Sequence, residues 1–301
     1  MHKHAGGPAA GWPGGCAVIT DRDKYFFDLR GYILLKGAIS KAHVKELNDG
    51  IDAIPKLDPG EWYGYVHGHA YNKNNGLNLQ QIYEAGEPFE RLIDHPSWIS
   101  HVSTFIGGEG TFDRKHGPLF IDENFASMRG PGDSIGLHSG AYPWTKRCQY
   151  HFSNGSFNCG QVNMLLALTD IGPGDGGTMV VPGSHKSNFR HPDLNKNGMR
   201  PEGNSVDGVE GAVEIFMEAG DAILFVDAIA HGSALRKNAG ERRIVVYRYG
   251  PSWGFFRDGY RPSPELLARL TPERRKIVWP HEPLKRSPNR LAEVEAEAVA
   301  Y

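Results

Sequence analysis

The sequence predicts a mainly β protein, a jelly roll with flanking α-helices. From residue 118 onwards, about eight short apolar segments are separated by Gly, Pro and Asp turns, as in jelly rolls. The chain holds 38 Gly and 20 Pro, which suits many tight turns between short strands. The segment 40–55 instead carries apolar residues at helical spacing, so we expect helices beside the strands.

The first third of the chain is predicted to mix one strand, two helical regions and a long loop. A short strand is expected at 32–36, and Ser40 can cap the helix at 40–55. The segment 57–82 is rich in Gly, Asn, His and Tyr and is expected to be irregular. Irregular segments of this length are often lids or binding loops. Residues 87–106 are predicted to form a helix in two pieces, broken at Pro96 because proline lacks a backbone donor.

The remainder of the chain is predicted to be rich in strands. The expected strands are 119–129, 133–138, 147–153, 161–169, 177–182, 212–217, 221–227 and 242–249. The polar stretch 186–211 is expected to be a surface excursion, and 262–301 a peripheral tail with helices at 264–269 and 272–278. A single domain spanning 1–301 is predicted, with residues 1–15 flexible.

Composition points to a small-molecule partner. A net charge of −2 gives no reason to expect a nucleic-acid polymer or a membrane as partner. The three cysteines are too few and too scattered for a disulfide framework or a zinc cage. The chain has no apolar run of about 18 residues and no signal-peptide apolar region at its start, so a cytoplasmic protein is expected. Composition does not indicate an oligomeric state.

Two histidines and an arginine stand beside predicted strands and are candidates for binding a metal and an anion. His138 ends a segment that begins with a Gly-Asp turn, and His231 follows the apolar strand 221–227. Arg242 comes eleven residues later and opens the last strand. Imidazoles with open sites suit iron(II), and a planar guanidinium can hold a carboxylate through two hydrogen bonds. The neighbouring Arg243 should point to the opposite face of that strand.

The ordered motifs resemble those of the phytanoyl-CoA dioxygenase-like family. They comprise His138, the stretch 176–185 that ends in Pro-Gly-Ser-His, the Gly-Asp pair before the strand 221–227, His231 and Arg242, and the likeness covers roughly 24–280. The resemblance implies a double-stranded β-helix of the cupin-like kind and an enzyme that uses iron(II), 2-oxoglutarate and O₂. It implies His138 and His231 as iron ligands and Arg242 as the partner of the distal 2-oxoglutarate carboxylate. It also implies a structural role for His185.

The chain departs from the family pattern at Gly140, where most members carry Asp or Glu. A related set of radical halogenases has Gly or Ala at this position, and chloride binds their iron in the vacated place. The departure predicts a chloride site beside Gly140 and chlorination of an unactivated carbon. One alternative is a hydroxylase with water in that place. Another is a carboxylate from elsewhere in the chain, for instance Asp133 or Asp170.

The substrate is expected to be a small polar metabolite. The chain length and the sequence around His138 and 177–188 are similar to nucleotide halogenases that chlorinate the sugar of 2′-deoxyadenylate in nucleoside-antibiotic pathways. This likeness implies an adenine nucleotide as substrate. A non-catalytic jelly-roll binder is the third hypothesis, and the presence of both histidines and of Arg242 speaks against it.

Further polar and aromatic residues are candidates for the walls of the site. Gln161 and Asn163 alternate onto one face of a predicted strand, and with Thr178 they could meet 2-oxoglutarate or a chloride-bound water. The alternative for these three is ordinary hydrogen bonding within the sheet. Cations favour a phosphate, and rings can pack against a base. The candidate substrate contacts, which core packing or surface polarity would explain equally well, are His67, His69, Tyr142, Trp144, Lys146, Arg147, Lys186 and Arg190.

Overall fold

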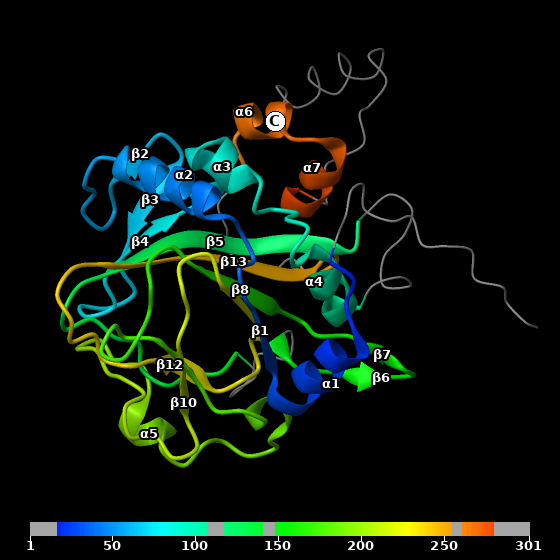
Figure 1. Cartoon of the computed structure of the whole chain (residues 1–301), viewed down its shortest axis with the longest axis vertical. Coiled ribbons are helices and arrows are strands. Elements are labelled where there is room, and N and C mark those ends of the chain that lie inside the picture. Colours follow the sequence, from blue (N-terminus) through cyan, green and yellow to red (C-terminus); the bar gives the residue numbers. More distant parts are fainter. Residues whose placement is uncertain (1–16, 108–116, 141–147, 255–260, 280–301) are drawn as a thin grey trace, which may run out of the picture.

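Two antiparallel sheets face each other and form the predicted jelly roll. The computed structural model describes residues 17–107, 117–140, 148–254 and 261–279. Apolar side chains from both sheets, among them Val180, Ile215, Phe225 and Ile244, pack together in one buried cluster. Figure 1 shows the smaller sheet on one side of the large sheet and the helices α2, α3, α6 and α7 on the other.

The large sheet has eight strands and carries most of the chain's β-structure. In spatial order its strands are β1 (Tyr32–Leu35), β11 (Ala222–Val226), β8 (Val162–Ala167), β13 (Arg242–Pro251), β5 (Leu119–Arg129), β4 (Leu77–Gln80), β3 (Val66–His69) and β2 (Trp62–Tyr63). The smaller sheet consists of β10 (Val213–Ile215), β9 (Thr178–Val180) and β12 (His231–Ser233). A hairpin of β6 (Phe152–Ser153) and β7 (Ser156–Phe157) stands apart.

The helices are short and mostly capped by side chains. Ser40 accepts a hydrogen bond from the His43 amide and begins the predicted helix, α2. The predicted break near Pro96 is confirmed, because one helix ends at Glu90 and the next begins at Ile99. The helices are α1 (Asp21–Arg30), α2 (Lys41–Asp52), α3 (Glu87–Glu90), α4 (Ile99–Ile106), α5 (Leu194–Asn197), α6 (Pro264–Arg269) and α7 (Pro272–Val278), with 3-10 turns at Ile82–Ala85 and Ser184–Lys186.

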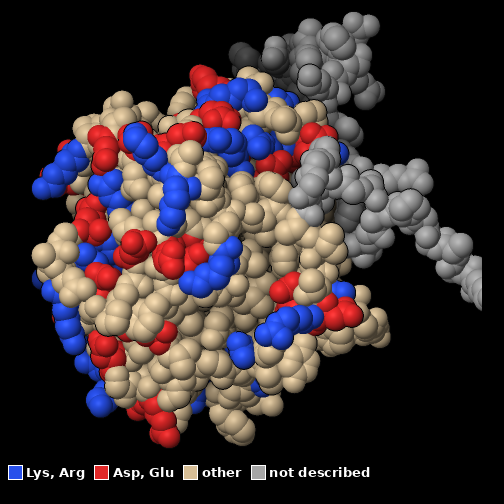
Figure 2. Space-filling view, viewed as in Figure 1, with Lys and Arg blue, Asp and Glu red and all other residues tan. Residues whose placement is uncertain are grey.

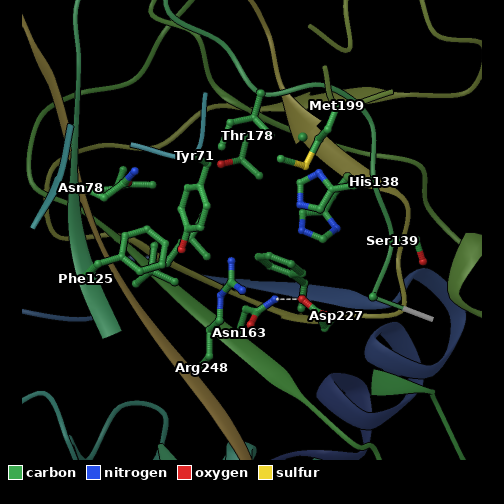
Figure 3. Close-up of a pocket in the computed structure, with 18 of the residues that line it drawn as sticks. Tyr71, Asn78, Phe125, His138, Ser139, Asn163, Thr178, Met199, Asp227 and Arg248 are labelled. Atoms are coloured by element: carbon green, nitrogen blue, oxygen red, sulfur yellow. Dashed lines mark hydrogen bonds between the residues drawn. The ribbon is translucent and has the colours of Figure 1, made fainter. Parts of the chain in front are cut away.

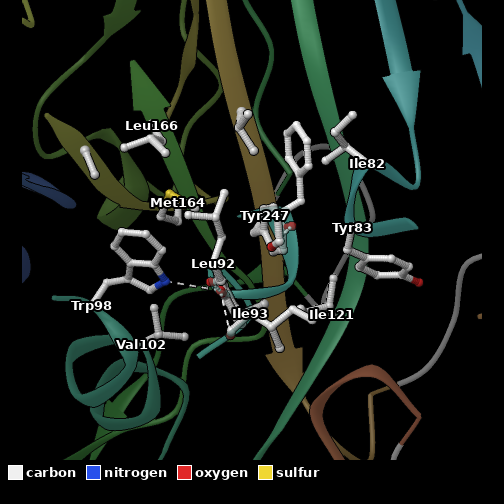
Figure 4. Close-up of a cluster of buried hydrophobic side chains, with 14 of the residues drawn as sticks. Ile82, Tyr83, Leu92, Ile93, Trp98, Val102, Ile121, Met164, Leu166 and Tyr247 are labelled. Atoms are coloured by element: carbon white, nitrogen blue, oxygen red, sulfur yellow. Dashed lines mark hydrogen bonds between the residues drawn. The ribbon is translucent and has the colours of Figure 1, made fainter. Parts of the chain in front are cut away.

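Strand β13 shows how residue alternation divides the molecule into two cores. Ile244 and Val246 face the smaller sheet and belong to the cluster between the sheets. Val245, Tyr247 and Tyr249 face the helices and belong to the other core. In that core, Trp98 Nε1 donates to the Tyr249 hydroxyl at 3.2 Å, and Figure 4 shows Tyr247 between Leu92 and Ile121. Successive side chains of a strand point to opposite faces, so this parity decides which residues can reach the space between the sheets.

Some predicted strands are shorter in the structure, or are missing. The segment 133–138 makes only isolated bridges, from Leu137 to Gly198 and from His138 to His231. Its two partners come from different parts of the chain, so no continuous ladder forms. Within the predicted strand 147–153 only β6 forms, and its turn to β7 runs through Asn154 and Gly155, both with positive φ. Residue 147 lies outside the described residues.

Three regions expected to be irregular or peripheral are better ordered than predicted. The segment 57–82 contains β2, β3 and β4, which extend the large sheet beyond β5. Its apolar residues alternate with polar ones, and this pattern is enough to bury Val66 and Leu79. The excursion 186–211 contains α5 and the fully buried Val206. Helices α6 and α7 have the predicted bounds, but Leu266 and Ile277 are buried in the helix-side core.

The surface is mixed in charge. Figure 2 shows acidic and basic side chains interspersed over the visible face, with no patch of a single sign. Among the described residues, no helix combines the length and the apolarity needed to cross a bilayer. Cys148 and Cys159 are buried and form no disulfide within the described part of the chain, whereas Cys16 lies outside it.

Candidate active site

The two predicted histidines lie together between the sheets. The amide of His138 donates to the carbonyl of His231 at 2.8 Å, and the amide of His231 returns the bond to His138 at 2.8 Å. Their ring centroids are 4.1 Å apart. A reciprocal backbone pair therefore fixes two imidazoles side by side, although they are far apart in the sequence.

The backbone around each ring determines which nitrogen can bind a metal. His138 Nδ1 lies 2.9 Å from the carbonyl of Gly136, and His231 Nδ1 lies 2.8 Å from that of Ile229. A carbonyl only accepts, so each Nδ1 carries the proton and each Nε2 keeps a lone pair. Burial, followed by the neighbouring His231, lowers the pKa of His138 to about 3, and burial also lowers the pKa of His231. Both rings are therefore neutral at physiological pH, as metal ligands must be.

A cavity of about 280 Å³ opens onto both histidines. Figure 3 shows it enclosed by aromatic, cationic and amide side chains that come from both sheets. Among its described lining residues, three are arginines and one is acidic: Arg129, Arg242, Arg248 and Asp227. Such a lining favours an anionic ligand.

The carboxylate of Asp227 lies against Gly140, where a side chain of residue 140 would begin. A Cβ added to Gly140 would lie 1.7 Å from Asp227 Oδ2 and 2.8 Å from the Cβ of Cys148. The Gly140 amide donates to the Asp227 carbonyl at 2.8 Å, which holds the turn after β11 against Gly140. The carboxylate lies where a side chain of residue 140 would begin, and the chloride site predicted at Gly140 stays a prediction.

Asp227 is held by polar partners on β8 and β13. Asn163 Nδ2 donates to Asp227 Oδ1 at 2.7 Å, as the dashed line in Figure 3 marks. Burial alone would raise the pKa of Asp227, but the Arg248 guanidinium and the Asn163 hydrogen bond contribute to holding it below its ordinary value. Arg248 also pairs with Glu123 at 3.1 Å. Asp227 is therefore an anchored anion, and the charged group nearest to it on β13 is Arg248.

Two arginines that line the cavity, Arg242 and Arg129, fit the distal carboxylate of a dicarboxylate. Arg242 on β13 and Arg129 on β5 are direct cross-strand partners, both buried and both lining the cavity. Arg129 donates to the Ser233 hydroxyl at 2.9 Å and Arg242 donates to the Gly176 carbonyl. The Nε atom of each guanidinium has no partner within the described residues. Arg243 lies on the opposite face, as predicted, and pairs with Asp52 at 2.7 Å.

The structure separates the three residues predicted beside the cosubstrate. Asn163 and Thr178 line the cavity. Gln161 is buried behind it, where its Nε2 donates to Asn163 Oδ1 at 3.1 Å and its Oε1 accepts from Cys148. Gln161 therefore orients Asn163, which in turn holds Asp227.

Few of the predicted substrate residues reach this cavity. His67 and His69 lie on β3, where they pack against Trp62 and Tyr71 respectively, and it is Tyr71 that lines the cavity. Lys186 pairs with Asp28 at 2.7 Å, and Lys186 and Arg190 line a neighbouring cavity, which shares His138 with the first. Four further candidates lie outside the described residues: Tyr142, Trp144, Lys146 and Arg147.

The remaining candidate ligands are engaged elsewhere. His185 Nε2 lies 2.9 Å from the Asp28 carbonyl, in agreement with a structural role. Asp133 accepts from the Gly130 amide and Asp170 from the Ala219 amide, each at 2.8 Å, and neither lines the cavity. Within the described residues, no three His, Cys, Asp or Glu side chains are arranged to hold a metal ion by themselves. The two neutral imidazoles nevertheless provide a donor pair that suits a divalent metal.

Three residues of the site escaped sequence reasoning. Asp227 and Arg248 stand at the ends of predicted strands, and Arg129 is the last residue of another. The sequence signal that could have found them is a charged side chain at the end of an apolar strand. For Arg248 the alternation of side chains along a strand adds a second signal, because Arg248 shares a face with Arg242.

Comparisons with known proteins show similarity over most of the chain. The family model described as phytanoyl-CoA dioxygenase matches residues 27–244. The dioxygenase cdmD of Talaromyces verruculosus is 33% identical over 240 residues, covering 73% of this chain and 68% of the relative. The dioxygenase FUM3 of Gibberella moniliformis is 33% identical over 238 residues, covering 76% of this chain and 71% of the relative.

A solved structure shares the fold at lower sequence identity. HygX from Streptomyces hygroscopicus, with nickel and 2-oxoglutarate bound, superposes with a TM-score of 0.63 and 22% identity, covering 83% of this chain and 94% of HygX. Its iron-bound form superposes with a TM-score of 0.62. These likenesses show the jelly-roll fold.

Proposed function

This chain belongs to the phytanoyl-CoA dioxygenase family of iron(II)/2-oxoglutarate enzymes, and from that premise we propose that it hydroxylates a small polar molecule. The observation that carries the proposal is the Asp227 carboxylate, which lies against Gly140 in the cavity of both histidines. It supplies a buried anion close to the residue at which most members of the family carry a carboxylate.

The residues of the cavity divide into two groups by the chemistry they support. His138 and His231 would hold iron(II) through Nε2, and Arg242 with Arg129 would hold the distal carboxylate of 2-oxoglutarate. Iron with 2-oxoglutarate supplies the activation of O₂ that hydroxylation of an unactivated carbon requires. The apolar walls, which include Phe125 and Phe225, exclude water and leave room for a substrate beside the two histidines.

Chlorination is the second candidate, and the absence of a side chain at residue 140 favours it. Chloride would have to bind in the same buried cavity as the Asp227 carboxylate, whose Oδ2 lies 1.7 Å from where a Cβ of residue 140 would be. Two anions so close repel each other strongly in a buried site, and Arg248 already pairs with Glu123. We therefore favour hydroxylation.

An anaerobic titration with iron(II) and 2-oxoglutarate tests the proposal. We expect a visible charge-transfer band that chloride does not change, and succinate formation in air that chloride does not increase. Asp227→Ala is the companion variant, because it opens space beside three arginines and should make the band sensitive to chloride. A chloride-dependent band and a chlorinated product from the unaltered protein would establish halogenation instead. The absence of any band would contradict both candidates.

As a narrower proposal, the substrate is an adenine deoxynucleotide. Tyr71 and Phe125 offer rings against which a base can pack. A second cavity shares Tyr71 and Met199 with the first and carries Lys73 and Arg200, which can meet a phosphate. Calorimetry should then show 2′-deoxyadenylate binding more tightly than 2′-deoxyadenosine to the loaded protein. Equal affinities would contradict a phosphate contact.

A further inference from the structure

We propose that Asp227, in the turn that follows β11, is a positioning carboxylate beside the two-histidine metal site, and that it strengthens metal binding without being a ligand itself. This inference rests on the proposed function, since it assumes that His138 and His231 bind a metal. It places a buried carboxylate near the metal although residue 140, where most members of the family carry one, is a glycine.

The backbone brings Asp227 against Gly140. His138 and His231 exchange two backbone hydrogen bonds, and Gly140, two residues after His138, donates to Asp227, four residues before His231. Residues 140 and 227 are therefore held together by a backbone hydrogen bond close to the isolated bridge between the histidines. Because Gly140 has no side chain, the Asp227 carboxylate can lie over its Cα, and any side chain at 140 would exclude it.

The surroundings of Asp227 position its charge. Asn163 Nδ2 donates to Oδ1 at 2.7 Å and is itself oriented by Gln161, whose Nε2 lies 3.1 Å from Asn163 Oδ1. Oδ2 is the oxygen that lies over Gly140, and Asp227 lines the same cavity as both histidines. One oxygen is therefore tethered to β8, whereas the other lies against Gly140.

Asp227 acts through the metal's surroundings and not as a third ligand of its own. Within the described residues, no three His, Cys, Asp or Glu side chains are arranged to hold a metal ion. A buried anion close to two imidazoles still strengthens the binding of a divalent cation, and it can accept a hydrogen bond from water bound to that cation. Removing such outer partners typically weakens metal affinity by about 10–100-fold.

Metal titration without turnover is the direct test. Iron(II), added anaerobically to the full chain and followed by calorimetry, should bind Asp227→Asn about 10–100-fold more weakly than the unaltered protein. Asp170→Asn is the matched control, because it removes the same charge from a carboxylate outside the cavity, and it should leave iron affinity unchanged. An Asp227→Asn variant that binds iron(II) as tightly as the unaltered protein would overturn the inference.

A double variant that moves the carboxylate between the two residues keeps the test decisive if Asp227→Asn simply fails to fold. The double variant Gly140→Asp, Asp227→Gly moves the carboxylate to residue 140 and removes the Asp227 side chain that a Cβ there would overlap, while the Cys148 Cβ, 2.8 Å from the new Cβ, has to shift. We expect it to recover most of the iron affinity lost in Asp227→Asn. A folded double variant that binds no better than Asp227→Asn would count against the inference.

The same titrations separate this inference from the proposed function. An unaltered protein that binds no iron(II), or a His138→Ala variant that binds it normally, would contradict the proposed function itself. Normal iron binding by the unaltered protein together with an undiminished Asp227→Asn variant would contradict only the role of Asp227.

Discussion

The carboxylate of Asp227 and the missing side chain of Gly140 are complementary: Oδ2 of Asp227 lies 1.7 Å from where a Cβ of residue 140 would be. The two residues are joined by a backbone hydrogen bond of 2.8 Å. Glycine at 140 therefore makes room for a carboxylate from the turn that follows β11.

Gly140→Ala should destabilise the protein although it adds only one methyl group. The new Cβ would overlap Asp227 Oδ2 and approach the Cys148 Cβ to 2.8 Å, so a buried charge would have to move. Overpacking of this kind costs about 1–3 kcal/mol, which urea unfolding can measure. The matched control is Gly172→Ala, whose added Cβ would meet its nearest neighbour, Asp175, at 3.7 Å. Equal stability of the two variants would mean that Asp227 lies elsewhere.

Arg242→Met should weaken 2-oxoglutarate binding, whereas Arg243→Met should not. The two residues are adjacent on β13, but only Arg242 lines the cavity, and Arg243 pairs with Asp52 and Glu241. Loss of one partner of a buried charge pair costs about 2–5 kcal/mol, which corresponds to a loss of at least 30-fold in affinity by calorimetry. An Arg242→Met variant with undiminished affinity would rule out this assignment of the cosubstrate site.

Much of the fold was predictable because local patterns carry it. The helix after Ser40, the strand that ends at Arg129 and both helices after Ser263 have apolar spacing or caps that are visible in the sequence. Short strands were not predictable. Strand β12 has three residues, His231–Ser233, and exists only because β9 pairs with it. Residues 133–138 show the reverse case, in which a plausible strand finds no continuous partner.

The residues of the site likewise divide into those that the sequence predicted and those that it did not. His138, His231 and Arg242 were found because each belongs to an ordered motif, and the structure brings all three to one cavity. The role of Asp227 could not be found from the sequence, because its contact with Gly140 arises from a backbone hydrogen bond between distant segments. Period-two alternation gives the face of each residue, but not which residue of another strand lies opposite it.

Asp221→Asn should destabilise the protein at neutral pH, and the difference should shrink in acid. Burial alone would raise the pKa of Asp221, but Lys36 and the amides of Gly37 and Glu218 outweigh it and lower the pKa below 3.8. A carboxyl whose pKa is lowered by folding stabilises the protein above the pKa of the unfolded chain, and the stabilisation is lost as pH falls through the folded pKa.

Urea unfolding at a series of pH values measures this effect. At pH 7 we expect Asp221→Asn to cost about 1–3 kcal/mol, since hydrogen bonds to a charged group are removed. The difference from the unaltered protein should stay constant down to about pH 5 and decrease below the unfolded pKa of about 3.9. A difference that grows as the solution is acidified would contradict the direction of the pKa shift.

Arg248→Met should be among the most destabilising single changes in the cavity, because two carboxylates depend on this guanidinium. Arg248 pairs with Glu123 at 3.1 Å, and its charge helps to lower the pKa of Asp227. Removing one partner of a buried ion pair costs about 3–5 kcal/mol, since the other charge remains buried and uncompensated.

A double-mutant cycle isolates the pair. If the penalty comes from the stranded Glu123 charge, Arg248→Met combined with Glu123→Gln should be more stable than Arg248→Met alone, and the coupling energy from urea unfolding should exceed about 1 kcal/mol. Additive effects would show that the two residues do not interact energetically. The Asp227 carboxylate remains in both variants, so the destabilisation that survives in the double variant includes the loss of the Arg248 charge near that anion, together with the contact of Arg248 with Phe125.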